Sequence, residues 1–464
     1  MIPVHTFSGQ TVSVLGLARS GLAAARALQA GGAIVQAWDD AEARREEAAA
    51  AGVPLTDLGQ WDWTGCAALV LSPGIPDMYP TANPIAAAAR DADCPIICDV
   101  DLLARAKPGA RYVGITGTNG KSTTSALVGH ILDGAGLPNQ VGGNIGVPAL
   151  DLDELEEAGA YVLELSSYQL ERVPSLKPNI AVLLNITPDH LDRHGGLDGY
   201  VAAKRMIFDN PAVGGHAIVG VEDGATRGIG LELMVRGAHK IIPISGSARA
   251  AGGVYGEAGI LFDDMEYGQV PVCDLKPVAA LPGTHNWQNA AAAYAVARLM
   301  DIDPEIIAAA IATFPGLPHR QEIVGAIGSV LYVNDSKATN SQAAAKALDC
   351  YDAIYWIAGG AFKEENLDAI APSFARLRGA YLIGEAASQF ETIIGSAAPV
   401  HQCGDLETAV MRAHAAAQKD IAGTDDVGVV LLSPACASFD QFENFEARGD
   451  AFRKIVQALE GASP

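Results

Sequence analysis

Residues 111–131, RYVGITGTNGKSTTSALVGHI, join a strand, a glycine-rich turn and the start of a helix, and they constrain the fold more than any other stretch. Gly114, Gly117 and Gly120 free the backbone to turn its N–H groups toward an anion, and Lys121 follows directly. Backbone amides, a helix N-terminus, a lysine and a hydroxyl beside Mg²⁺ together make a phosphate site. The stretch therefore predicts a parallel α/β sheet with a phosphate loop.

The spacing of this loop departs from the pattern G-x-x-x-x-G-K-[ST]. That pattern requires a glycine five residues before Gly120, where this chain has Ile115. A helix end alone stabilises a charge by only about 0.3–1 kcal/mol, so the lysine and a metal ion must supply most of the binding. A purely structural glycine turn is the alternative, and GKST directly after a strand argues against it.

The bulk composition excludes some partners. A chain of 464 residues with 49% hydrophobic and 18% charged residues predicts two or three globular domains. Its net charge of −23 argues against nucleic acid or an anionic membrane surface as partner, because both require a basic face. If the substrates carry phosphates, the positive charge that binds them must be local.

Cysteine usage and the N-terminus indicate a cytoplasmic protein. Seven scattered cysteines without a C-x-x-C pair are typical of a reduced compartment. The opening MIPVHTFSGQ has no basic segment before an apolar run, so no signal peptide is expected. We also expect no membrane-spanning segment, which would need about 18 apolar residues.

Three successive series of strand and helix patterns organise the chain. The first begins with TVSVLGLA, the second with YVGITG and the third with VLYVNDS. We place the boundaries near 98 and 316, which gives domains 1–98, 99–316 and 317–464. Residues 222–275 are rich in glycine and weakly patterned, and we predict β-hairpins or insertions there.

The N-terminal glycine motif leaves three interpretations open. Gly16 to Gly21 read G-x-A-x-x-G, and Asp39 follows at the distance where a dinucleotide-binding acid meets a ribose. This would suit a nicotinamide dehydrogenase. However, Ala18 replaces the glycine that lets the backbone approach a pyrophosphate, so a sugar nucleotide fits as well. An ordinary strand–helix turn is the third interpretation.

Two side chains after strands of the second series are candidate metal ligands. Glu164 ends YVLE, and His190 follows IAVLLNIT, where α/β sites lie. His190 and His194 have i, i+4 spacing, but Leu191 replaces the glutamate of H-E-x-x-H, which argues against zinc. Lys204, taken alone, resembles a solvated helix lysine.

Later polar segments suggest further contacts. Asn286 and Asn289 occupy one helix turn and can read an adenine edge or close over a phosphate, whereas helix capping explains only one of them. Arg320 lies on the stretch between the second and third series. Cys436 could be a nucleophile, but a small buried thiol is the better interpretation, because no base lies near it in sequence.

Eight segments resemble the Mur ligase family, in order and at similar spacings. They are GITGTNGKST, LELSSYQLE, NITPDHLDRH, YVAAK, GTHNWQN, GLPHR, NDSKATN and LLSPACASFDQFENFEARG. The resemblance covers nearly the whole chain and is weakest at 222–275 and 370–425. The family's loop has the form T-G-[TS]-N-G-K-[ST], so Ile115 is expected and the loop is implied to hold ATP.

The resemblance implies an α/β fold of three domains: an N-terminal Rossmann-like sheet, a central P-loop-type ATP-binding sheet and a C-terminal doubly wound Rossmann-like domain. Ser122 directly after Lys121 distinguishes the chain from folylpolyglutamate synthetases, which insert a glycine there. The ending SPACAS…DQF is similar to that of the branch that adds D-glutamate to UDP-N-acetylmuramoyl-L-alanine. That branch uses ATP and Mg²⁺, with two ions expected, and passes through an acyl phosphate.

The resemblance also implies roles for individual residues. The catalytic set is Lys121, Glu164, His190 and Lys204, with Lys204 implied to be carbamylated and with Ser122, Glu164, His190 and Lys204 as metal ligands. The ATP set is Gly117, Thr118, Asn119, Gly120, Lys121, Ser122, Thr123, Asn286, Asn289, Arg320 and Asp335. The UDP-sugar set is Arg19, Ser20, Asp39, Asp40, Ser72, Pro73, Gly74, Asn144 and His190. The D-glutamate set is Lys337, Thr339, Lys363, Ser438, Phe439 and Phe445.

The implied partners are two small molecules, the nucleotide sugar and D-glutamate, bound by a cytoplasmic monomer. Arg19 and Asp40 depart from the family's usual residues, so uracil and diphosphate recognition can differ in detail. Three alternatives remain open: a dehydrogenase that uses the N-terminal motif, an ATP-operated switch without amide product, and a ligase for another amino acid.

Overall fold

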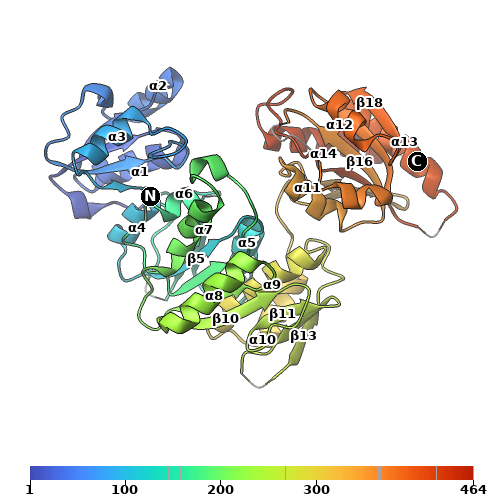
Figure 1. The fold of residues 1–464 in the computed structure, drawn as a ribbon, viewed down its shortest axis with the longest axis horizontal. Coiled ribbons are helices and arrows are strands. Elements are labelled where there is room, and N and C mark those ends of the chain that lie inside the picture. Colours follow the sequence, from blue (N-terminus) through green and yellow to red (C-terminus); the bar gives the residue numbers. More distant parts are fainter. Residues whose placement is uncertain (145, 157, 267, 363–366, 425, 463–464) are drawn as a thin grey trace. The chain divides into compact units, whose positions relative to one another are not determined.

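A computed structural model describes residues 1–144, 146–156, 158–266, 268–362, 367–424 and 426–462. The described strands form three sheets, and helices alternate with the strands along the chain, which confirms the predicted α/β class. Figure 1 traces the sheets in chain order, from blue through green and yellow to red. In the described part of the chain, no helix combines the length and apolarity needed to cross a bilayer.

The N-terminal residues fold into a small parallel sheet. Its elements are η1 His5–Phe7, β1 Thr11–Leu15, α1 Arg19–Ala30, β2 Ile34–Trp38, α2 Glu42–Ala50, η2 Leu58–Gln60, β3 Cys66–Leu71, α3 Pro84–Asp91, β4 Ile96–Ile97 and α4 Asp99–Ala106. The strand order is β2-β1-β3-β4, and all pairs are parallel. Because β2 and β3 flank β1, the loops that leave β1 and β3 meet at the carboxyl edge, where α/β sheets bind ligands.

The central residues form the largest sheet. Its elements are β5 Arg111–Thr116, α5 Lys121–Gly134, β6 Asn139–Gly143, β7 Ala160–Glu164, α6 Ser167–Leu170, β8 Ile180–Leu183, η3 Leu191–Arg193, α7 Leu197–Arg205, η4 Met206–Phe208, β9 His216–Gly220, α8 Gly224–Arg236, β10 Lys240–Ser245, β11 Val254–Glu257, β12 Ile260–Asp263, β13 Val270–Asp274, α9 Thr284–Arg298 and α10 Pro304–Ala312. β5 lies between β7 and β8, so the phosphate loop leaves the sheet at a switch point.

Residues 222–275 correct one expectation. The antiparallel pairs β11–β12 and β12–β13 confirm the predicted hairpins. However, α8 connects β9 to β10 in a parallel unit that we did not predict. The reason is that α8 carries apolar residues all round: Ile229 and Leu233 are buried, whereas Leu231 is 65% and Val235 is 89% exposed. Such a helix has no one-sided apolar periodicity to recognise.

The C-terminal residues form a doubly wound sheet. Its elements are β14 Glu322–Ile327, β15 Val330–Asn334, α11 Ser341–Leu348, β16 Ala353–Gly359, η5 Ala371–Arg376, β17 Leu377–Ile383, α12 Ala387–Ile394, β18 Val400–Gly404, α13 Leu406–Ile421, β19 Gly428–Leu432 and α14 Phe445–Ala462. Strand side chains alternate between two cores: Trp356 of β16 packs with α11 and α12, whereas Ile357 packs with α13 and α14. Both faces are therefore covered by helices, as expected for this class.

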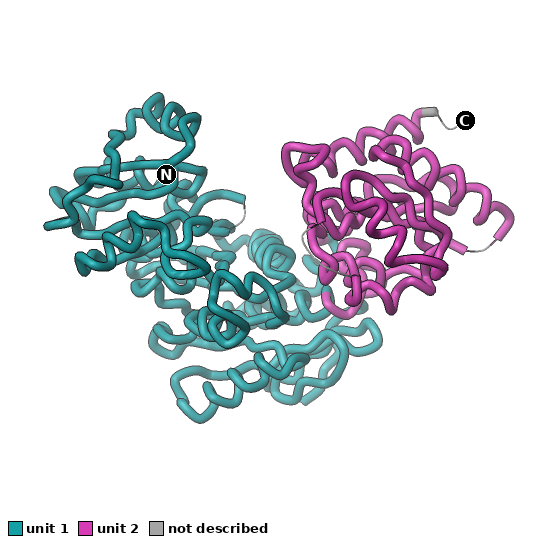
Figure 2. The backbone as a smooth tube through the Cα atoms, turned by 45° about the horizontal axis from the view of Figure 1, so that its top comes forward, with its two compact units in different colours: residues 1–275, 286–313 teal, residues 276–285, 314–464 magenta. Residues whose placement is uncertain are grey.

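The described chain divides into two compact units, teal and magenta in Figure 2. Unit 1 comprises residues 1–275 and 286–313, and unit 2 comprises residues 276–285 and 314–464. The boundary predicted near 98 lies between β4 and β5, inside unit 1, and the one predicted near 316 lies between α10 and β14. The division into domains 1–98, 99–316 and 317–464 stays a prediction.

Candidate active site

The phosphate loop of unit 1 is folded around its own lysine. Gly117 has φ +156° and Gly120 has φ +87°, a left-handed conformation that favours glycine. Lys121 begins α5, and its Nζ donates to the carbonyl oxygens of Gly117 and Thr118, each at 2.9 Å. The ammonium group of Lys121 is therefore hydrogen-bonded to the backbone of the loop at the N-terminus of a helix. This is the arrangement predicted for a phosphate site.

Helix α9 supports this loop from one side. A Cβ on Gly120 would lie 2.2 Å from Asn289 Oδ1, so the two residues are in close contact. The Asn289 amide donates to Asn286 Oδ1 at 3.0 Å, and its oxygen accepts from Thr124 Oγ1 at 3.3 Å. Both asparagines are buried. The structure thus places Asn289 in contact with the loop and joins Asn286 to Asn289.

Glu164 is a buried acid beside the loop, and one of its carboxylate oxygens is a candidate metal ligand. It ends β7 opposite Ile115 of β5 and is 2% exposed. Its Oε1 accepts from Asn144 Nδ2 at 2.8 Å, whereas Oε2 is buried and has no hydrogen-bond partner among the described residues. A buried anionic oxygen without a donor is costly, and a bound cation would remove that cost.

These donors fit Mg²⁺. Among the described residues, no three His, Cys, Asp or Glu side chains are grouped as a metal site. Mg²⁺ does not need such a group, because it commonly takes one or two carboxylates together with water and substrate phosphate oxygens. Glu164 and the hydroxyl of Ser122, which is buried in the first turn of α5, supply hard oxygen ligands of this kind.

Lys204 is buried beside the loop. It is 1% exposed on α7, so the solvated position that its local sequence suggests is wrong. Its Nζ donates to Gly117 O at 2.8 Å and to Thr116 Oγ1 at 3.4 Å, and it lies 4.8 Å from the ring centroid of Tyr200. Burial, and secondly the charge of Lys121, hold the pKa of Lys204 well below its ordinary value.

The two histidines after β8 differ in their surroundings. His190 has φ +50°, and its Nε2 lies 3.5 Å from Asp189 Oδ2. His194 is buried, and its ring nitrogens lie 3.1 Å from Glu171 Oε1 and 2.9 Å from Ser167 Oγ. Both nitrogens of His194 are therefore already hydrogen-bonded, which argues further against a zinc site with His190.

The loop after β8 is also joined to the phosphate loop. Thr118 Oγ1 donates to Thr187 O at 3.1 Å, and Thr187 N donates back to Thr118 Oγ1 at 3.0 Å. The Tyr200 hydroxyl lies 3.0 Å from the same oxygen. His190 therefore follows a segment whose position is tied to the loop.

The N-terminal sheet presents its predicted residues at one edge. Gly16 has φ +90°, and Ser72 Oγ donates to its carbonyl oxygen at 2.9 Å, which joins the loops after β1 and β3. Asp39 accepts from Leu17 N at 2.6 Å and from Ala41 N at 2.9 Å, so it shapes the glycine turn. Arg19 and Ser20 lie in the first turn of α1, Asp40 follows β2, and Pro73 and Gly74 follow β3.

In unit 2, the loops after β15 and β19 meet at Asp335. Asp335 N donates to Leu432 O at 2.7 Å, and Ser433 Oγ donates to Asp335 Oδ2 at 2.8 Å. Gln321 N donates to Asp335 Oδ1 at 3.2 Å. Burial raises the pKa of Asp335 to about 7 despite these hydrogen bonds.

Arg320 lies between two residues in the left-handed region. His319 has φ +62° and Gln321 has φ +46°, and neither is glycine. Backbone strain of this kind is held only where the surroundings fix it, and it often marks functional sites. This observation agrees with a functional position for Arg320.

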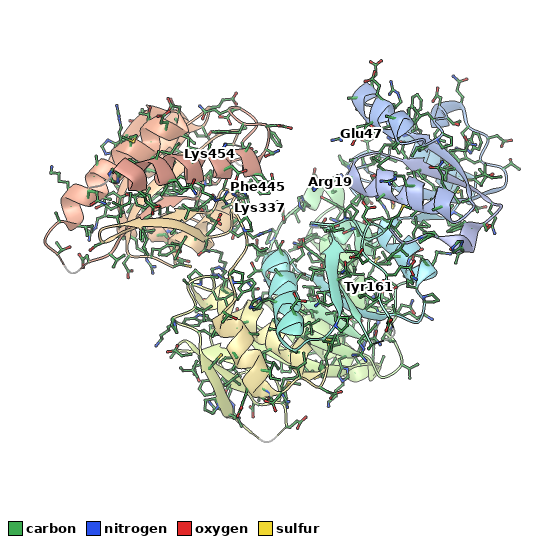
Figure 3. The ribbon with its side chains drawn as sticks, turned by 180° about the vertical axis from the view of Figure 1, so that it is seen from behind. Arg19, Glu47, Tyr161, Lys337, Phe445 and Lys454 are labelled. Atoms are coloured by element: carbon green, nitrogen blue, oxygen red, sulfur yellow. The ribbon has the colours of Figure 1, made fainter. Side chains whose placement is uncertain are left out.

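Most of the predicted D-glutamate residues lie in unit 2 on the loops that follow β15 and β19 or at the start of α14. Lys337 Nζ lies 3.8 Å from the centroid of the Phe445 ring, and Figure 3 labels both side chains. Ser438 is 2% exposed, whereas Phe439 is 69% exposed and Thr339 lies on the surface. Lys363 lies outside the described residues.

Sequence reasoning assigned no role to several residues that join these loops. Arg448 is buried on α14 and donates to Ser336 Oγ at 3.0 Å and to Cys436 O at 3.0 Å. Cys436 is a buried free thiol, as we expected. Tyr200, Arg172 and Arg193 were assigned no role either. An arginine or tyrosine beside a recognised motif was the only available signal, because their partners lie far away in sequence.

Comparisons with known proteins agree with this geometry. A family model described as "Mur ligase middle domain" matches residues 115–297. A UDP-N-acetylmuramoylalanine–D-glutamate ligase of Paramagnetospirillum magneticum is 51% identical over 462 residues, which cover 99% of each chain. The structure of a UDP-N-acetylmuramate–alanine ligase from Thermotoga maritima is 16% identical with a TM-score of 0.58, over 98% of this chain and 100% of that one. A MurF ligase from the same organism, solved with ADP, is 18% identical with a TM-score of 0.54, over 85% and 90% of the two chains.

Proposed function

Because the chain belongs to the Mur ligases, and within them to the UDP-N-acetylmuramoylalanine–D-glutamate ligases, we propose that it joins D-glutamate to UDP-N-acetylmuramoyl-L-alanine with ATP. The products are the extended nucleotide sugar, ADP and phosphate, and the reaction belongs to peptidoglycan precursor synthesis. We infer a cytoplasmic monomer that binds these small molecules and neither nucleic acid nor a membrane.

The chemistry explains why ATP is required. A carboxylate is a poor acyl donor because an oxide would have to leave. Transfer of the γ-phosphoryl group to the alanyl carboxylate gives an acyl phosphate, and the amine of D-glutamate attacks its carbonyl carbon. The C–O bond to the phosphate then breaks, and the amide forms. Anionic groups must be brought together, so the protein acts mainly by positioning and by supplying positive charge.

The observation that carries this proposal is the buried Oε2 of Glu164 beside a phosphate loop, which has no hydrogen-bond partner in the described part of the chain. Glu164 and Ser122 would hold a Mg²⁺ ion, and His190 a second. When bound, these ions neutralise the phosphate oxygens and the developing charge. Lys121 would hold the β- and γ-phosphates, with Gly117, Thr118, Asn119, Gly120 and Thr123 supplying backbone or hydroxyl donors. Asn286, Asn289, Arg320 and Asp335 are proposed to complete the ATP set.

Lys204 is proposed to act as a carbamate. Only a neutral amine reacts with CO₂, and the burial of Lys204 favours its neutral form. The carbamate would turn this amine into an oxygen ligand for a cation. If Lys204→Ala is inactive, acetate does not restore it, and removal of CO₂ leaves the wild type unaffected, this part of the proposal fails.

The remaining residues are proposed to hold the two other substrates. The nucleotide sugar would lie against Arg19, Ser20, Asp39, Asp40, Ser72, Pro73, Gly74, Asn144 and His190. The two carboxylates of D-glutamate suit the positive charge of Lys337 and Lys363. Thr339, Ser438, Phe439 and Phe445 would complete that set.

One assay tests the function directly. Purified protein is incubated with UDP-N-acetylmuramoyl-L-alanine, ATP and Mg²⁺, and D-glutamate or L-glutamate is added separately. We expect phosphate release that depends on D-glutamate, with an equal gain of D-glutamate mass in the nucleotide sugar. Oxygen-18 in the alanyl carboxylate should appear in the released phosphate.

Other outcomes would favour the alternatives. A preference for L-glutamate overturns the stereochemical assignment. ATP turnover without amide product would indicate a nucleotide-operated switch, and tight NAD(H) binding without ATP hydrolysis would indicate a dehydrogenase.

A further inference from the structure

Two arginines bind four consecutive carbonyl groups of the loop that follows β3. Arg172 donates to Ser72 O at 3.4 Å and to Ile75 O at 3.1 Å. Arg193 donates to Pro73 O at 3.4 Å and to Gly74 O at 3.0 Å. The loop belongs to the N-terminal sheet, whereas the arginines follow α6 and end η3 of the central sheet. Two guanidinium groups thus hold one turn.

Arg172 is built into this contact. It is 2% exposed, and its Nη2 also lies 3.0 Å from Asp77 Oδ1 in the same loop. A buried guanidinium needs acceptors, because an unpaired buried charge is strongly destabilising. Here one carboxylate and two carbonyl groups of a single loop supply them. The contact therefore holds both the loop and the Arg172 side chain in position.

The orientation of the carbonyl groups determines where the loop's donors point. Pro73 and Pro76 have no N–H, and Ile75 N donates to Ser72 O at 3.0 Å within the turn. Gly74 therefore carries the one remaining N–H of residues 73–76. Pro73 C=O and Gly74 N–H belong to one trans peptide and point in opposite directions. Since Pro73 O faces Arg193, the Gly74 N–H faces away from it.

The space beside Gly74 is open. A Cβ built on this residue would meet nothing within 4 Å, and the residue is exposed. Ser72 Oγ also ties this turn to Gly16 O, at the carboxyl edge, where α/β sheets bind ligands. An exposed N–H held in a fixed direction at such an edge is a donor for an anion.

Arg193 connects this turn to the segment that carries His190. Arg193 N donates to His190 O at 3.0 Å, and the guanidinium lies 4.5 Å from the ring centroid of Tyr168. A second contact joins the same two segments, since a Cβ on Gly195 would lie 3.1 Å from the Tyr79 ring. The turn and the His190 segment are therefore positioned together.

We propose that Arg172 and Arg193 are positioning residues that lock the turn 72–77, so that the Gly74 N–H is aimed at an anionic group of the nucleotide sugar. In this proposal both arginines act on the substrate through the turn. The inference rests on the proposed function for the identity of the substrate, and it assigns the two arginines a role in nucleotide-sugar affinity rather than in ATP binding.

The test replaces Arg193, which is only partly buried and can be changed without opening a core. Arg193→Ala should raise KM and Kd for UDP-N-acetylmuramoyl-L-alanine about tenfold to a hundredfold, as loss of hydrogen bonds from a charged donor predicts. KM for ATP and for D-glutamate should stay within about twofold. Arg193→Lys keeps the charge but cannot span two carbonyl groups, so it should restore only part of the affinity.

Arg236→Ala on α8 is the matched control, since this exposed arginine touches no part of the turn, and it should behave as wild type. The inference is overturned if both Arg193 variants bind the nucleotide sugar like wild type, or if Arg193→Ala weakens all three substrates equally. Failure of the proposed function looks different, because the wild-type protein itself would then neither bind nor extend the nucleotide sugar.

Discussion

Glu164 combines a proposed metal-binding role with a cost in stability. Its Oε2 is buried and has no hydrogen-bond partner among the residues that the structure describes, whereas Oε1 accepts from Asn144. Glu164→Gln keeps the shape and the Asn144 contact but removes the anionic ligand. We expect kcat to fall about a hundredfold or more and the Mg²⁺ requirement to rise. In metal-free buffer the free energy of unfolding should rise, by about 1–3 kcal/mol, because a buried charge is removed.

Activity at varied Mg²⁺ and urea unfolding with EDTA measure these two effects. Glu154→Gln is the control, since this acid pairs with Lys107 at the surface and lies away from the loop. A Glu164→Gln enzyme with wild-type Mg²⁺ dependence would contradict the metal role.

Asp335 makes the stability of the protein depend on pH. Burial raises the pKa of its carboxyl group to about 7, above the value of about 4 expected in the unfolded chain. Between these values the folded state keeps a proton that the unfolded state has lost. Stability should therefore fall as pH rises from about 4 to about 7, by at most about 4 kcal/mol from this group, and then level off.

Asp335→Asn should remove this fall, because asparagine has no proton to lose. Urea unfolding at several pH values measures it. Asp405→Asn is the control: Asp405 caps α13 at the surface, where asparagine caps equally well. An Asp335→Asn protein whose stability still falls like wild type would show that another group is responsible.

The phosphate loop and α9 depend on close contact at Gly120. A methyl group there meets Asn289 Oδ1 at 2.2 Å, in addition to the strain of a left-handed residue. Gly136, just after α5, has φ +70° but nothing within 4 Å of its Cβ. Gly136→Ala should therefore cost only the strain, about 1–2 kcal/mol, whereas Gly120→Ala should cost more and weaken ATP binding.

A double-mutant cycle measures the contact itself. If the clash dominates, Gly120→Ala should cost less in an Asn289→Ala background than in the wild type. Equal costs in both backgrounds, measured by urea unfolding, would mean that the contact contributes nothing.

Sequence patterns predicted the elements whose signal is local. β1, β5 and β19 are short apolar runs that end in glycine or polar residues, and their positions followed directly. The placement of Glu164 and Asp335 at the carboxyl ends of strands was predictable for the same reason, and their roles in a site stay predictions. Helix α8 was not predicted, because its exposed face is as apolar as its buried face.

Contacts between distant segments could not be predicted. Arg172 and Arg193 reach a loop that lies about a hundred residues earlier, and nothing local distinguishes them from surface arginines. The burial of Lys204 was likewise hidden, because its helix carries charged neighbours. These positions depend on how sheets pack, which a single sequence does not display.

Mg²⁺-ATP should stabilise unit 1, which holds most of the proposed ATP set, more than unit 2, which holds Arg320 and Asp335. The chain forms two compact units, and Lys121, Glu164 and Lys204 all lie in unit 1. A ligand that binds only the native state adds about 2.7 kcal/mol at a hundred times its Kd. We therefore expect Mg²⁺-ATP to raise the midpoint of the calorimetric transition that reports unit 1, and Lys121→Ala to abolish that rise.

The two transitions can be assigned independently, because Asp335 lies in unit 2. The transition whose pH dependence changes in Asp335→Asn reports unit 2, and the other reports unit 1. If ATP raises the unit 1 midpoint in Lys121→Ala as much as in wild type, the nucleotide binds without this lysine. The proposed contact between Lys121 and the β- and γ-phosphates would then be wrong, and the other donors of the phosphate loop would have to supply the binding.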